Sequence, residues 1–405
     1  MAYDLRPITE EEYPAFATAN AGGFGWEPNP EMFGDNLKTL ELDRTLASFD
    51  GPEVVGTTAI FSFDLTVPGN TLPTAGVTWV SVKPTHRRQG ILRDMMARQL
   101  SDVRDRGEAL AALWASESII YGRFGYGVAA QDMEFKIDRL RTALAREAPG
   151  CSGRTRLVSR DEAMAAWPAV YDEARKVRPG FFSRSEPFWQ YHTMRERDMD
   201  RRGGSRFNVQ YEEDGAIRGY ARYRVRPGHD GMASGALTVW ELTALTSNAY
   251  SALWQYIFGV DLIATIEASH RPQDEPLFWM LADPRRLVRS VYDTLWLRII
   301  DVPAAMQGRS YAWEGDIVLD VRDPFCPWVE GRFELEMSTE GAKCTPTTRD
   351  ADVTLSAADL GAIYLGGEKL TTLARAGRVE GDYEALRRAD VLLGWDRAPW
   401  CPEVF

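Results

Sequence analysis

The residues with the clearest chemical potential form one short stretch, VSVKPTHRRQGIL at positions 80–92. An alternating β-branched run leads into an arginine-rich turn, and Gly90 then opens a long amphipathic run. The first turn of a helix carries unpaired backbone N–H groups and about half a positive charge. Gly90 would let a phosphate approach those groups, and Arg87 and Arg88 could add charge-assisted contacts. The stretch therefore indicates a phosphate-binding turn, with an ordinary helix start and two solvated arginines as the alternative.

Other cofactor motifs are missing from the sequence. It has no GxxxxGK[ST] pattern, which excludes a P-loop, and its glycine clusters do not form GxGxxG after a strand. The cysteines are scattered without a CxxC pair, and the histidines lie far apart outside any HExxH pattern. We therefore expect neither a Rossmann dinucleotide site nor a metal centre.

A second motif lies downstream, where residues 116–127 read SESIIYGRFGYG. The order V-x-V-x-P-x-x-R-R-x-G, a helix, a strand and then Y-x-x-F-G-Y resembles the GNAT superfamily of N-acetyltransferases. In that superfamily the first motif holds the pyrophosphate of acetyl-CoA, and a tyrosine in the position of Tyr121 lies near the coenzyme sulfur. Tyr126 matches the aromatic residue that closes the motif. The resemblance covers roughly residues 1–145.

Strands and helices of the first segment must position these two motifs. Apolar periodicity predicts, in chain order, a strand, a helix, a hairpin, a strand, a helix, a strand and a short helix. The expected ranges are Tyr3–Arg6, a helix behind a Thr9–Glu12 capping box, Thr45–Phe49 with Val54–Phe63, Gly76–Val82, Gly90–Gly107, Ala109–Ser116 and Ile119–Phe124. This order is typical of a mixed α+β domain.

The middle of the chain repeats this order more weakly. The predicted elements are the hairpin Phe207–Tyr211 and Ala216–Val225, the strand Leu237–Leu245, the helix Asn248–Gly259 and the strand Asp261–Ala268. At the matching strand-to-helix turn, ALTSNAY stands in place of HRRQGIL. We interpret the segment as an internal duplication whose second copy has lost the chemistry of that turn.

A third segment is expected to begin near Leu297. Its predicted strands and helices are Ile317–Val321, Arg332–Met337 and Ala351–Leu355, then Ser356–Leu365, Leu370–Ala376 and Tyr383–Leu392. The tail DRAPWCPEVF ends at Phe405. Its tryptophan and prolines suggest a docked end, although chain ends are usually frayed.

A working acetyltransferase unit, a degenerate second copy, a third domain similar to sterol carrier protein and a terminal Phe together resemble the Eis (enhanced intracellular survival) family. The resemblance implies a mixed α/β (α+β) fold with tandem GNAT-like domains at residues 1–148 and 149–292. A sterol-carrier-protein-like α/β domain at residues 293–405 would supply the C-terminal carboxylate. It also implies assembly as a homohexamer.

The resemblance further implies an acetyl-CoA-dependent N-acetyltransferase, with acetyl-CoA as cosubstrate. Its substrates would be primary amines of small cationic molecules, namely aminoglycosides, lysine-like amines and polyamines. Tyr121 would be the general acid toward the leaving thiolate, and the carboxylate of Phe405 the general base. The residues implied to bind acetyl-CoA are Val80, Ser81, Val82, Arg87, Arg88, Gln89, Gly90, Ile91, Leu92, Arg93, Ser116 and Glu117.

The terminal carboxylate can act as a general base only if its pKa is raised above the ordinary value. A chain terminus has an ordinary pKa of about 3.3–3.7, which makes it a weak base toward an ammonium group of pKa about 10.4. Burial raises the pKa of a carboxylate, so we expect the end of the chain in a partly desolvated pocket. Glu403 would add negative potential there or be solvated. Residues 24–27 either line the amine's entrance or cover the core.

The net charge of the chain indicates which classes of molecule it binds. The chain of 405 residues has a net charge of −12, which argues against general nucleic-acid binding and suits cationic substrates, or serves solubility alone. The N-terminus lacks an apolar signal region, and no apolar run approaches the roughly 20 residues of a membrane span. We expect a cytoplasmic protein that does not span a membrane.

Two other functions stay open at this stage. Tandem GNAT units also occur in aminoacyl transferases that use aminoacyl-tRNA, but those need a basic surface that an acidic chain does not suggest. Alternatively, the third domain would carry a lipid while the acetyltransferase unit is vestigial.

Overall fold

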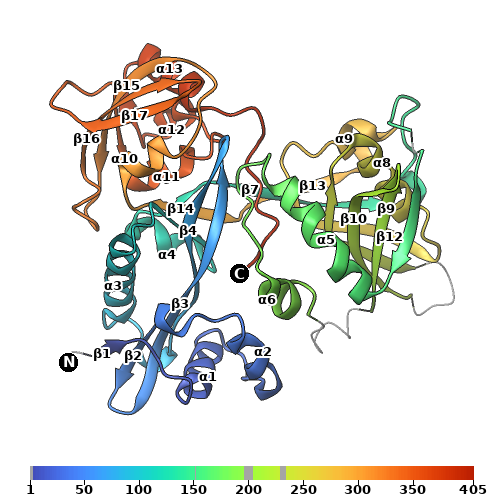
Figure 1. The fold of residues 1–405 in the computed structure, drawn as a ribbon, viewed down its shortest axis with the longest axis horizontal. Coiled ribbons are helices and arrows are strands. Elements are labelled where there is room, and N and C mark those ends of the chain that lie inside the picture. Colours follow the sequence, from blue (N-terminus) through green and yellow to red (C-terminus); the bar gives the residue numbers. More distant parts are fainter. Residues whose placement is uncertain (1–2, 151, 196–203, 229–233) are drawn as a thin grey trace. The chain divides into compact units, whose positions relative to one another are not determined.

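A computed structural model describes residues 3–150, 152–195, 204–228 and 234–405. The chain forms two compact units (Figure 1). The first comprises residues 1–130, 294–399 and 403–405, and the second comprises residues 131–293 and 400–402. Each unit is built around a seven-stranded sheet, and the first also contains a five-stranded sheet.

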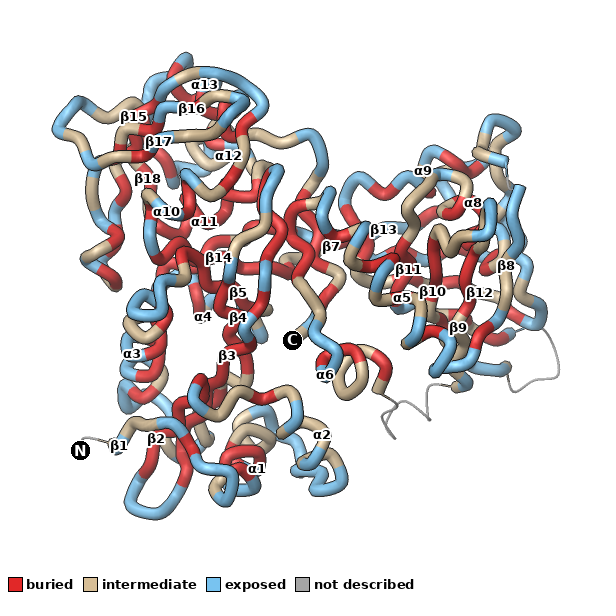
Figure 2. Tube along the Cα trace, viewed as in Figure 1, coloured by how far each residue is buried: buried red, intermediate tan, exposed pale blue. Residues whose placement is uncertain are grey.

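The first sheet carries both sequence motifs. Its strands, in spatial order, are β1 (Asp4–Arg6), β2 (Thr45–Asp50), β3 (Glu53–Val67), β4 (Asn70–Val82), β5 (Leu110–Trp114), β14 (Leu295–Ile299) and β6 (Gly127–Val128). Only β4 and β5 pair in parallel. Its helices are α1 (Tyr13–Gly23), α2 (Phe33–Leu37), α3 (Ile91–Asp105) and α4 (Ser118–Tyr121). Strands β3 and β5 are largely buried, and so is the middle of β4, Thr74–Thr78 (Figure 2).

The capping box predicted from Thr9 and Glu12 forms only in part, and it does not cap α1. The helix begins at Tyr13, and its N-cap residue is Glu12 without a side-chain cap. Pro14, which lacks an N–H group, occupies the first turn and suits a helix start there. The Glu12 carboxylate accepts from the Thr9 N–H at 2.9 Å, as a capping box requires, and it pairs with Arg6 at 2.6 Å.

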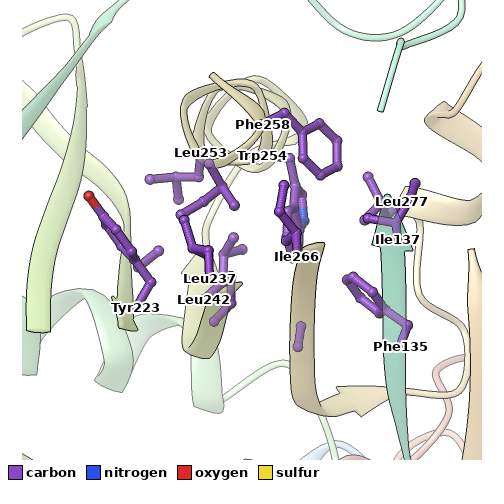
Figure 3. Packing of buried hydrophobic residues seen from close by; sticks show 14 of the residues in the cluster. Phe135, Ile137, Tyr223, Leu237, Leu242, Leu253, Trp254, Phe258, Ile266 and Leu277 are labelled. Carbon is purple, nitrogen blue, oxygen red and sulfur yellow. The ribbon is translucent and has the colours of Figure 1, made fainter. Parts of the chain in front are cut away.

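The second unit repeats the first sheet. Its strands, in spatial order, are β8 (Arg154–Val158), β9 (Ser205–Glu213), β10 (Ala216–Arg226), β11 (Gly235–Ala244), β12 (Ile263–Pro272), β7 (Gln131–Asp138) and β13 (Val288–Asp293). Its helices include α5 (Arg160–Arg175), α6 (Glu186–Phe188), α8 (Ser247–Phe258) and α9 (Leu277–Met280). Trp254 and Leu253 of α8 pack with Leu237 and Ile266 of the sheet in one apolar cluster (Figure 3). The matching strand order agrees with an internal duplication.

The two copies exchange one strand each. In both sheets, the sixth position is filled by a strand from the other half of the sequence. Strand β7 pairs with β12 and β13, while β14 pairs with β5 and β6. Leu297, near which the third segment is expected to begin, therefore lies in the first sheet. Its sequence is apolar enough for a central strand, but only the tertiary pairing shows which sheet it joins.

The five-stranded sheet completes the first unit. Its strand order is β17 (Gly341–Pro346), β16 (Gly331–Ser338), β15 (Gly315–Arg322), β18 (Val353–Ser356) and β19 (Glu380–Gly381). The helices are α10 (Val302–Gln307), α11 (Ala357–Ile363), α12 (Leu370–Arg375) and α13 (Tyr383–Leu393). Polar β17, two-residue β19 and short α10 were not predicted, because each lacks a clear apolar period. In the described parts of the chain, every helix is too short or too polar to cross a membrane.

Candidate active site

A β-bulge interrupts strand β4 at the first motif. Thr78 pairs with Ala59 and Ser81 pairs with Thr57, so two β4 residues face the single β3 residue between them. One of the two, Trp79, has a φ of 55°, a left-handed conformation that is uncommon outside glycine. Its carbonyl accepts hydrogen bonds from Asn20 at 2.8 Å and Thr57 at 2.7 Å. The bulge therefore redirects the last residues of β4, where Val80–Val82 lie.

Strand β4 separates from its parallel neighbour just before the bulge. The pairing of β4 with β5 covers only Thr74–Gly76 and ends at Ala112 of β5. Beyond that point, in the described structure, the β5-facing edge of β4 has no strand partner. Backbone N–H and C=O groups along such an edge can bind an extended ligand, as an added strand would.

Helix α3 begins directly behind this edge. Its N-cap is Gly90, which has a φ of 89° and supplies no side-chain cap. A glycine adopts this left-handed conformation without the cost that other residues incur. The first N–H groups of the helix lack intrahelical acceptors by geometry. They form a ready anion site at the end of the first motif.

The arginines of the turn have different surroundings. Arg87 donates to the Gly23 carbonyl at 2.8 Å and to the Val82 carbonyl at 3.4 Å, so it ties the turn to α1 and β4. Arg88 and Arg93 are exposed, and each makes no hydrogen bond or ion pair within the described residues. Arg88 also has a left-handed φ of 64°, which costs on the order of 1 kcal/mol or more. The free guanidinium groups are thus those of Arg88 and Arg93.

These elements surround a cavity of about 800 Å³, large enough for a cofactor. Of the residues that the resemblance assigns to acetyl-CoA, the cavity is lined by Val80, Ser81, Val82, Arg87, Arg88, Gly90, Ile91, Leu92, Arg93, Ser116 and Glu117. Gln89 does not line it, and its side-chain oxygen accepts a hydrogen bond from the Tyr3 hydroxyl. Sequence reasoning did not assign Gly23, His86, Ile120, Arg123 and Phe124, which also line the cavity. The stacked pair of Phe24 and Trp26 is exposed, and Phe24 reaches the cavity wall.

Tyr121 lies at the same cavity, at the end of α4. Its side chain is only 4% exposed, and burial raises the pKa of the phenol to about 12. A hydrogen bond with Ser116 partly opposes that shift, and the Glu117 charge adds to it. The Tyr121 ring contacts Tyr126 edge to face, with ring centroids 6.1 Å apart. At neutral pH the phenol is fully protonated and can act as a donor.

The end of the chain is docked rather than frayed. The Phe405 ring packs edge to face on Phe63 of β3, with centroids 5.2 Å apart. A Cβ on Gly76 of β4 would stand 3.3 Å from that ring. Glu403 is 4% exposed and therefore is not a solvated residue. Phe405 does not line the cavity of Tyr121, but it packs on the strand whose continuation does.

The second copy keeps the bulge but not the rest of the site. In β11, Glu241 pairs with Arg222 and Val239 with Tyr223, which leaves Trp240 as an extra residue. The Thr246 hydroxyl caps α8 by accepting from the Ala249 N–H at 3.1 Å. The side chain of Arg271 on β12 reaches the Leu242 carbonyl of β11 at 3.0 Å. Protein groups thus occupy positions that are open in the first copy, and the loss of the turn's chemistry stays a prediction.

Three parts of the chain match families of known proteins. Residues 4–129 and 180–299 match two families described as acetyltransferase (GNAT) domains, and residues 302–402 match a family described as a sterol carrier protein domain. These matches confirm the predicted fold class, two GNAT domains followed by a sterol-carrier-protein-like domain. The fold and the site together define an N-acetyltransferase of the GNAT class, which is an acyltransferase.

Full-length relatives identify the family. An uncharacterized N-acetyltransferase of Streptomyces coelicolor is 39% identical over 415 residues and all of both chains. The N-acetyltransferase Eis of Mycobacterium tuberculosis is 37% identical over 412 residues, 98% of each chain. The crystal structure of Eis1 from Mycobacterium abscessus superposes with a TM-score of 0.87 at 32% identity, covering 99% of this chain and all of that one. The chain belongs to the Eis family of N-acetyltransferases.

Proposed function

We propose that this N-acetyltransferase transfers the acetyl group of acetyl-CoA directly to primary amines of small cationic molecules. The observation that carries the proposal is the cavity that joins the open edge of β4, the uncapped start of α3 and the buried Tyr121. GNAT domains use acetyl-CoA, and the cavity lining has groups suited to its pyrophosphate, its pantetheine arm and its thioester. The amine classes proposed are aminoglycosides, lysine-like amines and polyamines.

Coenzyme binding follows from the first motif. The pyrophosphate would accept hydrogen bonds from the first N–H groups of α3 and charge-assisted contacts from Arg88 and Arg93. The pantetheine arm would lie along the unpaired edge of Val80–Val82 and reach Ser116 and Glu117. This extended arrangement would carry the thioester toward Tyr121.

Activation of the amine is assigned to the terminal carboxylate. An ammonium group of pKa about 10.4 must lose a proton at pH 7, which costs about 4.6 kcal/mol. We propose that the Phe405 carboxylate attracts the ammonium and accepts that proton, directly or through water. Support comes from the docked tail, with Phe405 on Phe63 and with Glu403 buried two residues earlier.

The thioester chemistry then needs an oxyanion site and a proton. The amine nitrogen forms the new C–N bond and loses its second proton to solvent, and the C–S bond breaks. A backbone N–H of Val80–Val82 would stabilise the oxyanion. A complete proton transfer from a phenol of pKa about 12 to a thiolate of pKa about 8.5 would cost about 5 kcal/mol. Tyr121 is therefore proposed to hydrogen-bond the developing thiolate and to release its proton only as the C–S bond breaks, regaining one from solvent.

Substrate class is supported by charge. A net charge of −12 favours the approach of polycationic amines over that of nucleic acids. The homohexamer implied by the family resemblance and the cytoplasmic location expected from the sequence stay predictions.

The test is a screen for acetyl-CoA-dependent thiol release with polyamines, lysine peptides and aminoglycosides, with mass spectrometry of the products. We expect acetylated amine and free CoA in equal amounts. Absence of heat on titrating acetyl-CoA into folded protein would contradict the proposal. A gel shift with tRNA at physiological salt would favour the aminoacyl transferase instead, and a lipid seen by native mass spectrometry would favour the carrier.

A further inference from the structure

A buried ion pair lies beneath the tyrosine motif. Arg298 of β14 is 0% exposed, and its guanidinium pairs with the carboxylate of Asp323, which is 2% exposed. Asp323 follows β15, and its other carboxylate oxygen accepts from the N–H groups of Phe325 at 3.0 Å and Cys326 at 2.9 Å. The carboxylate is thus fixed by its own loop, and it fixes the arginine.

The guanidinium packs directly against the turn that holds Tyr121. A Cβ on Gly125 would stand 1.9 Å from the Arg298 Nη1 atom, and Gly125 has a left-handed φ of 80°. Its carbonyl accepts a long hydrogen bond from Arg298 at 3.5 Å. Burial raises the pKa of the Tyr126 hydroxyl, and the nearby positive charge of Arg298 partly opposes that shift. Gly125 is therefore required by close approach as well as by its backbone conformation.

Two further contacts fix the same turn. The Phe124 ring meets Phe325 edge to face, with centroids 4.9 Å apart, so the loop of Asp323 also contacts the turn directly. Beyond the turn, β6 packs on α11, and a Cβ on Gly127 would stand 1.7 Å from the Ala358 carbonyl oxygen. The turn from Tyr121 to Gly127 is thus bounded by an exchanged strand and by the sterol-carrier-protein-like domain.

A buried ion pair is an unusual means of packing. Two desolvated charges often stabilise a protein no more than apolar side chains of the same volume would. Such a pair can instead contribute orientation, because a planar guanidinium fixes its partners in direction as well as in distance. Here the partners are a carboxylate of the third domain and the glycine four residues after Tyr121.

We propose that Arg298, held by Asp323, is a positioning residue that sets the orientation of Tyr121 toward the coenzyme sulfur. The inference rests on the proposed role of Tyr121 and deepens it. It assigns a catalytic contribution to the third domain through its loop at Asp323, in addition to the end of the chain.

The test uses the full-length enzyme and the paired variant Arg298→Met with Asp323→Leu, which removes both charges together. The matched control is Arg44→Met with Glu108→Leu, another buried pair of the first unit with side chains 3% and 11% exposed. We expect kcat of the test variant to fall by about 10- to 100-fold, since small misplacements of a catalytic group have effects of that size. The Kd for acetyl-CoA and the kcat of the control should each stay within about twofold of wild type. The single variant Arg298→Lys, which keeps a positive charge beside Asp323, should lower kcat less than the paired change does.

The same paired change in a Tyr121→Phe background separates positioning from general damage. If Arg298 acts through Tyr121, the paired change should lower kcat there by less than about twofold. The inference is overturned if the drop is equally large in both backgrounds, or if kcat of the paired variant matches that of the control. Should the paired variant fail to fold, the isosteric Asp323→Asn is judged by the same criteria.

A spectroscopic readout distinguishes this inference from the proposed role of Tyr121. The ¹⁹F resonance of 3-fluorotyrosine at position 121 should shift or broaden in the test variant and not in the control. An unchanged resonance overturns the positioning role whatever Tyr121 does. If the resonance changes in the paired variant but Tyr121→Phe keeps wild-type kcat, Arg298 positions Tyr121, and Tyr121 is not the general acid.

Discussion

At the scale of single residues, Tyr121 and Tyr126 form a natural matched pair. Both are buried tyrosines of one turn, but only Tyr121 lines the cavity, while the Tyr126 hydroxyl has no hydrogen-bond partner among the described residues. We expect Tyr121→Phe to lower kcat by about 100-fold, the lower range for loss of a general acid, with the Kd for acetyl-CoA unchanged. Steady-state kinetics and calorimetry check this, with Tyr126→Phe as the control. Equal effects of the two variants would reduce Tyr121 to a packing residue.

The pH dependence of the reaction follows from the same residue. Burial raises the pKa of Tyr121 from its ordinary value near 10 to about 12, which favours the protonated phenol in the folded state. The phenol's contribution to stability is therefore complete below about pH 10 and is lost as the pH rises through about 12. We expect no loss of kcat from Tyr121 ionisation below about pH 11. Phenolate absorbance of wild type minus Tyr121→Phe measures this titration, and a difference signal near pH 10 would contradict it.

Arg87 and Arg88 are adjacent but differ in what they bind. Arg87 donates to two carbonyls of the turn, whereas Arg88 makes no bond within the described residues. We expect Arg88→Ala to weaken acetyl-CoA binding by about tenfold, the loss of one charge-assisted contact, without lowering Tm. Arg87→Ala should lower Tm as well. Calorimetry and thermal melts decide, and identical behaviour of the two variants would refute the assignment of Arg88 to phosphate.

At the scale of elements, the start of α3 can be tested by comparing its two ends. Gly90 and Gly107 flank the helix, and both have left-handed φ values, of 89° and 75°. A Cβ at either position would meet nothing within 4 Å, so alanine adds strain of about 1–2 kcal/mol without a clash. We expect both alanine variants to lose similar stability, but only Gly90→Ala to weaken acetyl-CoA binding. Equal affinities in the two variants would mean that the pyrophosphate lies elsewhere.

Elements were largely predictable where their apolar period is strong. The predicted strand Gly76–Val82 and helix Gly90–Gly107 correspond to β4 and α3, because each buries one face. The bulge at Trp79 was not predicted, since a bulge depends on how two strands pair and not on either sequence alone. Yet the bulge and the early end of the β4–β5 pairing create the open edge of the cavity.

At the scale of the whole molecule, the proposed role of the C-terminal carboxylate can be tested by extending the chain. Adding a few residues after Phe405 replaces its carboxylate by a peptide bond and moves the charge away. We expect such an extension to lower kcat by about 100-fold or more while acetyl-CoA binding is retained. An extension of the same length before Met1 is the control. Full turnover of the C-terminally extended enzyme would remove the carboxylate from the mechanism.

Sequence by itself determined the chemistry of the motif and the repeat. The residue types at positions 80–92 and 116–127 predict an anion-binding helix start and a phenol that can donate a proton, because backbone amides and a tyrosine have the same chemistry in any fold. It also predicts which of the two copies is active, since the second turn lacks the glycine and arginines of the first.

Only the tertiary structure decided what surrounds those groups. Strand exchange places Arg298 against Gly125, and the loop at Asp323 reaches the same turn, although these residues are far apart in the chain. Desolvation of Tyr121, the docked Phe405 and the buried Glu403 likewise depend on packing between distant segments. A local pattern cannot encode such contacts, because burial and pKa are set by the neighbours that folding brings together.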